Sequence, residues 1–221
     1  MREIVFDLET TGLDPKSGHR IVEVGCVELI DRKITGQSFH TYVNPERDVP
    51  VSAQKIHGIT TEFLKDKPVF SSIVKEFLGF IAQDRLIIHN ASFDMGFINH
   101  QLVALGKPAI AHQRAMDTLE MARKKFPGAK ATLDALCVRY NISLERRDKH
   151  GALLDAELLA EVYIQMMGGY QNAFNLQQDT KNVTVIAGKP STKGFPRLAR
   201  PFPASEEEIE LHTAFMQKIK K

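Results

Sequence analysis

The 221-residue chain has no tryptophan, only two cysteines and no long run of apolar residues. Two cysteines cannot build the disulfide framework of a small secreted domain, so we expect free thiols in a reducing compartment. A membrane-spanning helix needs about 20 successive apolar residues, and no segment approaches that length. The opening residues, MREIVFDLET, lack the apolar core of a targeting peptide. We therefore expect a cytoplasmic protein with no membrane partner.

The chain also lacks a strong excess of charge of either sign. The formal net charge is +2 at pH 7, but the charge is unevenly distributed. Residues 171–221 hold 8 Lys or Arg and 5 Asp or Glu, a net of +3, which leaves the first 170 residues at −1. Hydrophobic residues make up 43% and charged residues 25%, which excludes wholesale disorder, collagen and coiled-coil rods.

The residue pattern changes near residue 168. Before it, periodic apolar segments alternate with short turns; after it come a polar stretch and four prolines between Pro190 and Pro203, which exclude a continuous helix. From Ser205 on, a capping serine, early glutamates and late lysines match the dipole of a helix. We predict an enzyme-sized domain over residues 1–170, a flexible basic linker over 171–204 and a docking helix over 205–221.

Periodicity predicts strands early in the chain and helices later. The expected strands are residues 3–9, 19–30, 38–45, 85–90 and a short one near 115–116, with a hairpin turn over 31–36. The expected helices are residues 69–83, 93–106, 119–126, 132–140 and 152–167. Three strands followed by alternating helices and strands favour an α/β fold with a mixed central sheet flanked by helices.

Asp7 and Glu9 lie two residues apart on the first predicted strand and so project from the same face. Neighbouring carboxylates repel each other and need a cation or a shared proton. On their own they are more simply a solvated strand face. The turn that follows, beginning Thr10-Thr11-Gly12, adds backbone and hydroxyl donors that could receive the polar end of a substrate.

Two more acids stand at positions where an unpaired carboxylate is costly. Asp155 lies on the apolar stripe of the last predicted helix of the domain, and Asp94 is flanked by Phe93 and Phe97. Asp94 alone is more simply a first-turn acid serving the helix dipole. His150 falls on the loop before the Asp155 helix, where an isolated histidine is usually only solvated. We interpret Asp117 as a helix cap rather than a ligand.

The four acids and His150 together could serve one purpose, which is phosphoryl transfer catalysed by metal ions. Carboxylate oxygens suit Mg²⁺ or Mn²⁺, and two such ions stabilise the attacking and leaving oxygens of an in-line phosphoryl displacement. A nearby histidine can deprotonate the attacking water. The sequence therefore predicts a metal site made of Asp7, Glu9, Asp94 and Asp155, with His150 as the base.

The segments DLETTG, HNASFD and HGALLD resemble the three motifs of the DEDDh 3′→5′ exonucleases, in that order. The segment IHGIT, residues 56–60, is similar to the branch of that family typified by the epsilon proofreading subunit of bacterial DNA polymerase III. The resemblance covers about residues 3–168 and implies an RNase H-like fold.

The resemblance also implies roles for single residues. Asp7 would bridge two divalent cations, Glu9 and Asp155 would complete one site, and Asp94 would hold the second ion. Glu9 and the backbone near Thr10 and Thr11 would recognise the terminal 3′-hydroxyl of a DNA strand. His57, from a loop, would contact the end of the strand. Without the resemblance, His57 is an ordinary turn histidine.

The tail carries two possible partner segments. The polymerase alpha subunit is the partner implied for the terminal helix, whose apolar residues include Ile209, Phe215 and Met216. Gln171, Phe174 and Leu176 resemble a sliding-clamp peptide, a short pattern that also arises by chance. A small third core subunit is a further partner that the same branch suggests.

Three functions are consistent with these features of the sequence. The leading one is a proofreading 3′→5′ DNA exonuclease that releases nucleoside 5′-monophosphates. An RNA-trimming or oligoribonucleotide-degrading enzyme of the same superfamily would keep the chemistry, although such an enzyme needs no terminal helix. A non-catalytic replication scaffold would need none of the five site residues.

Overall fold

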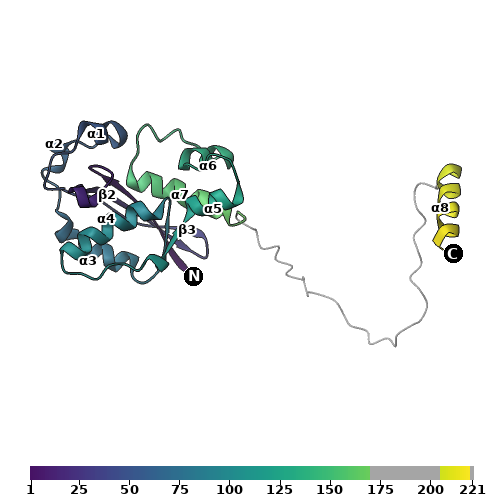
Figure 1. Cartoon of the computed structure of the whole chain (residues 1–221), viewed down its shortest axis with the longest axis horizontal. Helices are drawn as coiled ribbons and strands as arrows, with labels where there is room; N and C mark the ends of the chain where they lie inside the picture. Colours follow the sequence, from purple (N-terminus) through teal and green to yellow (C-terminus); the bar gives the residue numbers. More distant parts are fainter. Residues whose placement is uncertain (170–204, 220–221) are drawn as a thin grey trace, which may run out of the picture. The chain divides into compact units, whose positions relative to one another are not determined.

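The computed structural model describes residues 1–169 and 205–219 (Figure 1). The chain divides into two compact units between Phe174 and Asn175, and each is described by itself. In the first unit the elements follow in the order β1 (Arg2–Thr10), η1 (Pro15–Ser17), β2 (Ile21–Ile30), β3 (Lys33–Tyr42), α1 (Val51–His57), α2 (Thr61–Leu64), α3 (Phe70–Ile81), β4 (Arg85–Ile88), α4 (Ala91–Ala104), η2 (His112–Arg114), β5 (Ala115–Asp117), α5 (Thr118–Lys125), α6 (Leu133–Arg139) and α7 (Ala152–Met166).

The described strands form one five-stranded mixed sheet in the order β3-β2-β1-β4-β5. β1 pairs antiparallel with β2, which pairs antiparallel with β3, while β4 lies parallel to β1 and β5 parallel to β4. The expected fold class is confirmed, and β1 occupies the centre of the sheet. The carboxyl ends of β1 and β4 therefore meet at one edge of the sheet, where a ligand site is common in such folds.

Helices cover both faces of the sheet. On one face, Ile4 and Phe6 of β1 pack in a buried cluster with residues of α3 and α4. On the other face, Val5 packs with Leu159 and Tyr163 of α7. Burying a side chain of this size stabilises the fold by about 1.5–3 kcal/mol, so the second of these cores fixes α7 over β1 and β2.

The first turn of α7 lies against β2 because Gly25 has no side chain. A Cβ atom at Gly25 would stand 2.3 Å from the backbone of Ala152, so a larger residue would push the helix away. Gly25 is the register partner of Asp7 on β1. The close approach thus places the beginning of α7, and with it Asp155, beside Asp7.

Three sequence predictions need correction. The hairpin turn is confined to Asp31 and Arg32, both with positive φ (50° and 61°), so residues 33–36 belong to β3 and not to the turn. The short helices α1 and α2 were not predicted, since neither shows an apolar stripe long enough to detect. His57 is the last residue of α1 and not part of a loop.

The second unit is represented by α8 (Glu206–Ile219). Ser205 and Glu208 form a capping box: the Ser205 Oγ accepts from the Glu208 N–H at 3.3 Å, and the Glu208 carboxylate accepts from the Ser205 N–H at 2.9 Å. The helix begins where the sequence predicts. No helix within residues 1–169 or 205–219 is long and apolar enough to cross a membrane.

Candidate active site

Asp7 and Glu9 lie on the face of β1 that α7 covers. Successive strand residues point to opposite faces, and Val5 of the same strand belongs to the core beneath α7. Asp7 and Glu9 therefore continue the Val5 face, near the carboxyl end of the strand. Glu9 is only 9% exposed, so its carboxylate is largely withdrawn from water.

Asp94 reaches the same place from the first turn of α4, and it is 3% exposed. The helix begins at the end of β4, where Asn90 adopts a left-handed conformation with φ of 68°. Asp117 at the end of β5 accepts the N–H groups of Asn90 and Ala91 at 3.1 and 3.0 Å and also that of Leu119 at 2.8 Å. Asp117 is thus a helix cap, as predicted, and it ties the starts of α4 and α5 together.

Asp155, one turn into α7, is 3% exposed and is held by an arginine that the sequence reasoning missed. The guanidinium of Arg147 donates Nε–H to Asp155 Oδ1 at 2.6 Å and Nη2–H to Oδ2 at 2.7 Å, a bidentate pair. Arg147 also pairs with Asp134. A divalent cation at Asp155 would compete with Arg147 for the same oxygens.

The acids of this site disfavour one another's ionisation. The pKa of Asp7 is raised well above its usual value by burial and by the charges of Asp94, Glu9 and Asp155. Burial, followed by the charge of Asp155, raises the pKa of Glu9 to about 8. Burial likewise raises the pKa of Asp94 well above its usual range. When these carboxyl groups are ionised, the positive charge of Arg147 is therefore too small to balance their negative charge.

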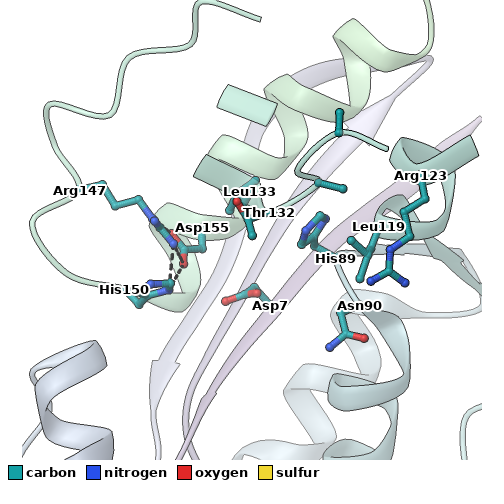
Figure 2. A pocket seen from close by; sticks show the side chains of 12 residues that line it. Asp7, His89, Asn90, Leu119, Arg123, Thr132, Leu133, Arg147, His150 and Asp155 are labelled. Carbon is teal, nitrogen blue, oxygen red and sulfur yellow. Dashed lines mark hydrogen bonds and ion pairs between the residues drawn. The ribbon is translucent and has the colours of Figure 1, made fainter. Parts of the chain in front are cut away.

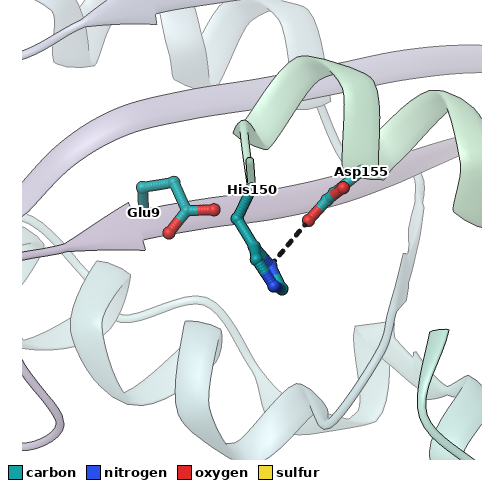
Figure 3. A group of neighbouring side chains, drawn as sticks. All are labelled: Glu9, His150 and Asp155. Carbon is teal, nitrogen blue, oxygen red and sulfur yellow. Dashed lines mark ion pairs between the residues drawn. The ribbon is translucent and has the colours of Figure 1, made fainter. Parts of the chain in front are cut away.

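This donor set fits divalent cations. Hard carboxylate oxygens are the ligands that Mg²⁺ and Mn²⁺ prefer, and a cation would relieve the repulsion. Ligand atoms of Glu9, His150 and Asp155 lie within 4.8 Å of one another (Figure 3). His150 is exposed, and its Nδ1 lies 3.1 Å from Asp155 Oδ2. The imidazole thus stands beside the carboxylates, where it can either accept a proton or bind a metal.

Glu23 on β2 is a second residue that the sequence reasoning missed. It is 3% exposed and pairs in register with Glu9. Its carboxylate accepts the Ala152 N–H at 3.1 Å and lies 2.7 Å from His40 Nε2. Since Gly151 at the helix start offers no capping side chain, Glu23 takes that place and fixes the beginning of α7.

The turn after β1 uses many of its donors internally. The Thr10 hydroxyl donates to the Gly12 carbonyl at 2.6 Å, and the Thr11 N–H donates to the Arg20 carbonyl at 2.8 Å. The Thr11 hydroxyl accepts the Arg20 N–H at 3.0 Å. These contacts shape the turn.

His57 is buried at the end of α1, with 6% exposure. Its Nδ1 accepts the Ile59 N–H at 3.0 Å, and Gly58 after it is left-handed, with φ of 76°. Burial lowers the pKa of His57, although the Thr10 backbone opposes that shift. Within the described residues, the buried Nε2 has no hydrogen-bond partner.

A cavity of about 510 Å³ opens beside the acids (Figure 2). Asp7, Arg147, His150 and Asp155 line one part of it. The other part is lined by His89, Asn90, Leu119, Arg123, Ala129, Ala131, Thr132 and Leu133. Its volume lies within the range of about 300–1,000 Å³ typical of ligand sites.

The predicted partner residues are divided between described and undescribed segments. Gln171, Phe174 and Leu176 lie outside the described residues. Ile209, Phe215 and Met216 lie on α8 with 55%, 59% and 42% exposure. Residues 205–219 alone thus leave these apolar side chains of α8 unburied.

The raised pKa of Glu9 predicts how stability depends on pH without metal. Between the unfolded value near 4.5 and the folded value of about 8, the folded state holds the extra proton, so stability falls as pH rises. In a chelator, Glu9→Gln should flatten the fall in melting temperature between about pH 5 and pH 8, where 1 kcal/mol corresponds to about 2–4 °C. Glu76→Gln, an exposed control, should not change the slope; equal slopes in all three proteins would refute the effect.

Comparison with known families gives a consistent result. Residues 4–163 match the family model described as Exonuclease. The DNA polymerase III subunit epsilon of Rickettsia felis is 47% identical over 227 residues, covering 100% of this chain and 98% of its own length. The protein of that name from Salmonella typhimurium is 42% identical over 231 residues, covering 100% of this chain and 94% of its own.

Two solved structures show the same fold. Exonuclease X in complex with 5′-overhanging duplex DNA has a TM-score of 0.60 and 27% identity, over 75% of this chain and 90% of its own. The nuclease domain of 3′hExo, a DEDDh family member bound to rAMP, has a TM-score of 0.65 and 18% identity, over 75% of this chain and 91% of its own.

Proposed function

Because the chain belongs to the exonuclease family, we propose that it is the metal-dependent proofreading 3′→5′ exonuclease of a bacterial replicative DNA polymerase. The observation that carries the proposal is the convergence of four acids and one exposed histidine, of which Asp7, Asp155 and His150 line the cavity. The names of the relatives that match its full length support the polymerase assignment. Since replication of a bacterial chromosome takes place in the cytoplasm, we place the protein there.

The proposed ligands of two Mg²⁺ or Mn²⁺ ions are the acids that repel one another in the structure. Asp7 would bridge the ions, Glu9 and Asp155 would complete one site, and Asp94 would serve the other. When bound, such ions neutralise charge on the phosphodiester and lower the pKa of water. The raised pKa values of Asp7, Glu9 and Asp94 support this assignment. They show that the ionised carboxylates are unfavourable without a nearby positive charge, and a bound cation would supply that charge.

The side chains divide the remaining work. His150 accepts the proton of the attacking water, and the carboxylate of Asp155, 3.1 Å from Nδ1, stabilises the positive charge that the ring then carries. In the structure, Arg147 donates Nη2–H to the same Nδ1 at 2.9 Å and so orients the ring. The water oxygen attacks the phosphorus, the bond to the 3′-oxygen of the preceding nucleotide breaks, and that oxygen takes a proton. The products are a nucleoside 5′-monophosphate and a strand shortened by one residue. Glu9, the Thr10 backbone and the His57 Nε2 bind the terminal nucleotide.

Mispaired 3′ ends should be removed faster than paired ones. A centre buried between β1 and α7 can act only on a frayed strand, and fraying a mismatched end costs less free energy than fraying a matched one. Release of the terminal nucleotide from matched, mismatched and single-stranded DNA measures this directly. Equal rates on all three would contradict proofreading, and faster release from a single-stranded RNA of the same sequence would favour the RNA-trimming alternative.

We propose that α8 docks on the polymerase alpha subunit, and that the segment with Gln171, Phe174 and Leu176 binds the sliding clamp. A small third core subunit is a further proposed partner.

Phe215→Asp with Met216→Asp should weaken polymerase binding by about 10²-fold or more, because each buried side chain contributes about 1.5–3 kcal/mol. Exonuclease rates on single-stranded DNA should stay unchanged, since the site lies wholly in residues 1–169.

Co-elution with the polymerase subunit measures the docking. Gln217→Asp adds one negative charge at a polar, exposed position of α8 without removing an apolar side chain, and it serves as the control. A chain ending at Gly169 should behave as the double variant does. Full-strength binding by that shortened chain would show that the partner surface lies elsewhere.

A further inference from the structure

The cavity beside the acids extends away from the residues that are proposed to bind the terminal nucleotide. Asp7 and Asp155 line it, but Glu9, Thr10 and His57 do not. Those three residues lie beyond Asp7, at the end of β1 and at the end of α1. A strand whose last nucleotide occupies the Glu9 side and whose scissile phosphate lies at Asp7 therefore continues, in the 5′ direction, into the cavity.

Arg123 supplies a positive charge in that part of the cavity. It projects from α5, is exposed, and its guanidinium extends toward Asn90 (Figure 2). In the described part of the chain, no carboxylate lies within 4.0 Å of it, whereas its neighbour Lys124 pairs with Glu120 at 4.0 Å. An arginine with no protein counter-ion inside a substrate cavity is suited to a phosphate, whose oxygens match its planar donors.

Neutral donors and apolar atoms complete the surroundings of Arg123. The Thr132 hydroxyl accepts the Ala135 N–H at 3.3 Å and keeps its own proton to donate. The Asn90 oxygen accepts the Ser92 hydroxyl at 3.3 Å, while its amide nitrogen has no acceptor among the described residues. Leu119 and Leu133 offer apolar surface to a sugar. Within the lining there is no Phe, Tyr or Trp on which a base would stack.

We propose that Arg123, with Asn90 and Thr132, forms a subsite for the phosphate on the 5′ side of the scissile linkage. The inference rests on the proposed function and adds to it a residue that holds the strand rather than the terminal nucleotide. Because the contact is to the backbone, it is the same for every base. The subsite keeps the penultimate nucleotide in place while the bond beside it is broken.

A single neutral linkage in the substrate tests the subsite. Two short thymidylate oligonucleotides are compared, one natural and one with a methylphosphonate at the second linkage from the 3′ end, and the first cleavage is followed. For the unaltered protein, the neutral linkage should lower kcat/KM about tenfold, the worth of a charge-assisted hydrogen bond. Arg123→Ala should cleave both strands equally, at the rate of the unaltered protein on the neutral strand.

The controls separate this inference from the function on which it rests. Arg123→Lys should keep part of the difference, and Lys124→Ala, next to it but outside the cavity lining, should keep all of it. If the unaltered protein cleaves both strands equally, or if Arg123→Ala still distinguishes them, the subsite is wrong and the exonuclease assignment stands. If the natural strand is not cleaved at all in Mg²⁺ or Mn²⁺, the proposed function fails and the subsite fails with it.

Discussion

Asp7→Asn should lower the exonuclease rate in saturating Mg²⁺ by about 10³-fold or more, because loss of the ion-bridging carboxylate forfeits several kcal/mol of transition-state stabilisation. Asparagine keeps the size of the side chain, so the fold should survive. The same change should raise the melting temperature in a chelator, since burial and four neighbouring acids oppose the ionisation of Asp7. Single-turnover release of the terminal nucleotide and thermal unfolding of the metal-free chain measure the two effects.

Asp48→Asn is the matched control, because Asp48 is exposed. It should change neither the rate nor the melting temperature. Asp155→Ala should also abolish activity, but it leaves Arg147 without its bidentate partner and should not stabilise the metal-free chain. Retention of more than a small fraction of the rate by Asp7→Asn would rule out a metal mechanism built on this residue.

His150→Ala should slow hydrolysis by about 10²–10⁴-fold, the usual contribution of a general base. Metal binding should change little, because the four acids remain. His150 lies close enough to Glu9 and Asp155 to be a metal ligand rather than a general base, so both roles need to be tested. Single-turnover rates and calorimetric titration with Mn²⁺ separate the two roles, with His112→Ala, an exposed histidine elsewhere, as the control.

A ligand role for His150 would give a different pattern. Affinity for Mn²⁺ would fall about tenfold or more, as it does when the support of a metal site is lost, and excess Mn²⁺ would restore the rate. An unaltered rate in His150→Ala would remove the residue from the mechanism altogether.

The sequence predicts most of the sheet and the acids upon it, for a clear physical reason. The alternation in β1 shows directly that Asp7 and Glu9 share a face, because a strand has a period of two residues. The apolar stripe of α7 likewise exposes Asp155 as a charged residue in an apolar position. Both patterns can be recognised from residues that are close together in the sequence.

The residues that the sequence reasoning missed depend on contacts across the fold. Glu23 caps α7 at Ala152, 129 positions away, and neither residue carries a local sign of that contact. Arg147 looks like any loop arginine until Asp155 is folded against it. The sequence does not reveal that His57 ends a helix, because α1 is short, starts after Pro50 and has no side-chain cap.

The most direct test of the account is a crystal structure with Mn²⁺ and thymidine 5′-monophosphate, in which anomalous scattering locates the ions. The account predicts two peaks, one in contact with Asp7, Glu9 and Asp155 and the other on the Asp94 side of Asp7, with Arg147 displaced from Asp155 and His150 bound to neither ion. A single peak held by Glu9, His150 and Asp155, with Asp7 and Asp94 uninvolved, would contradict it.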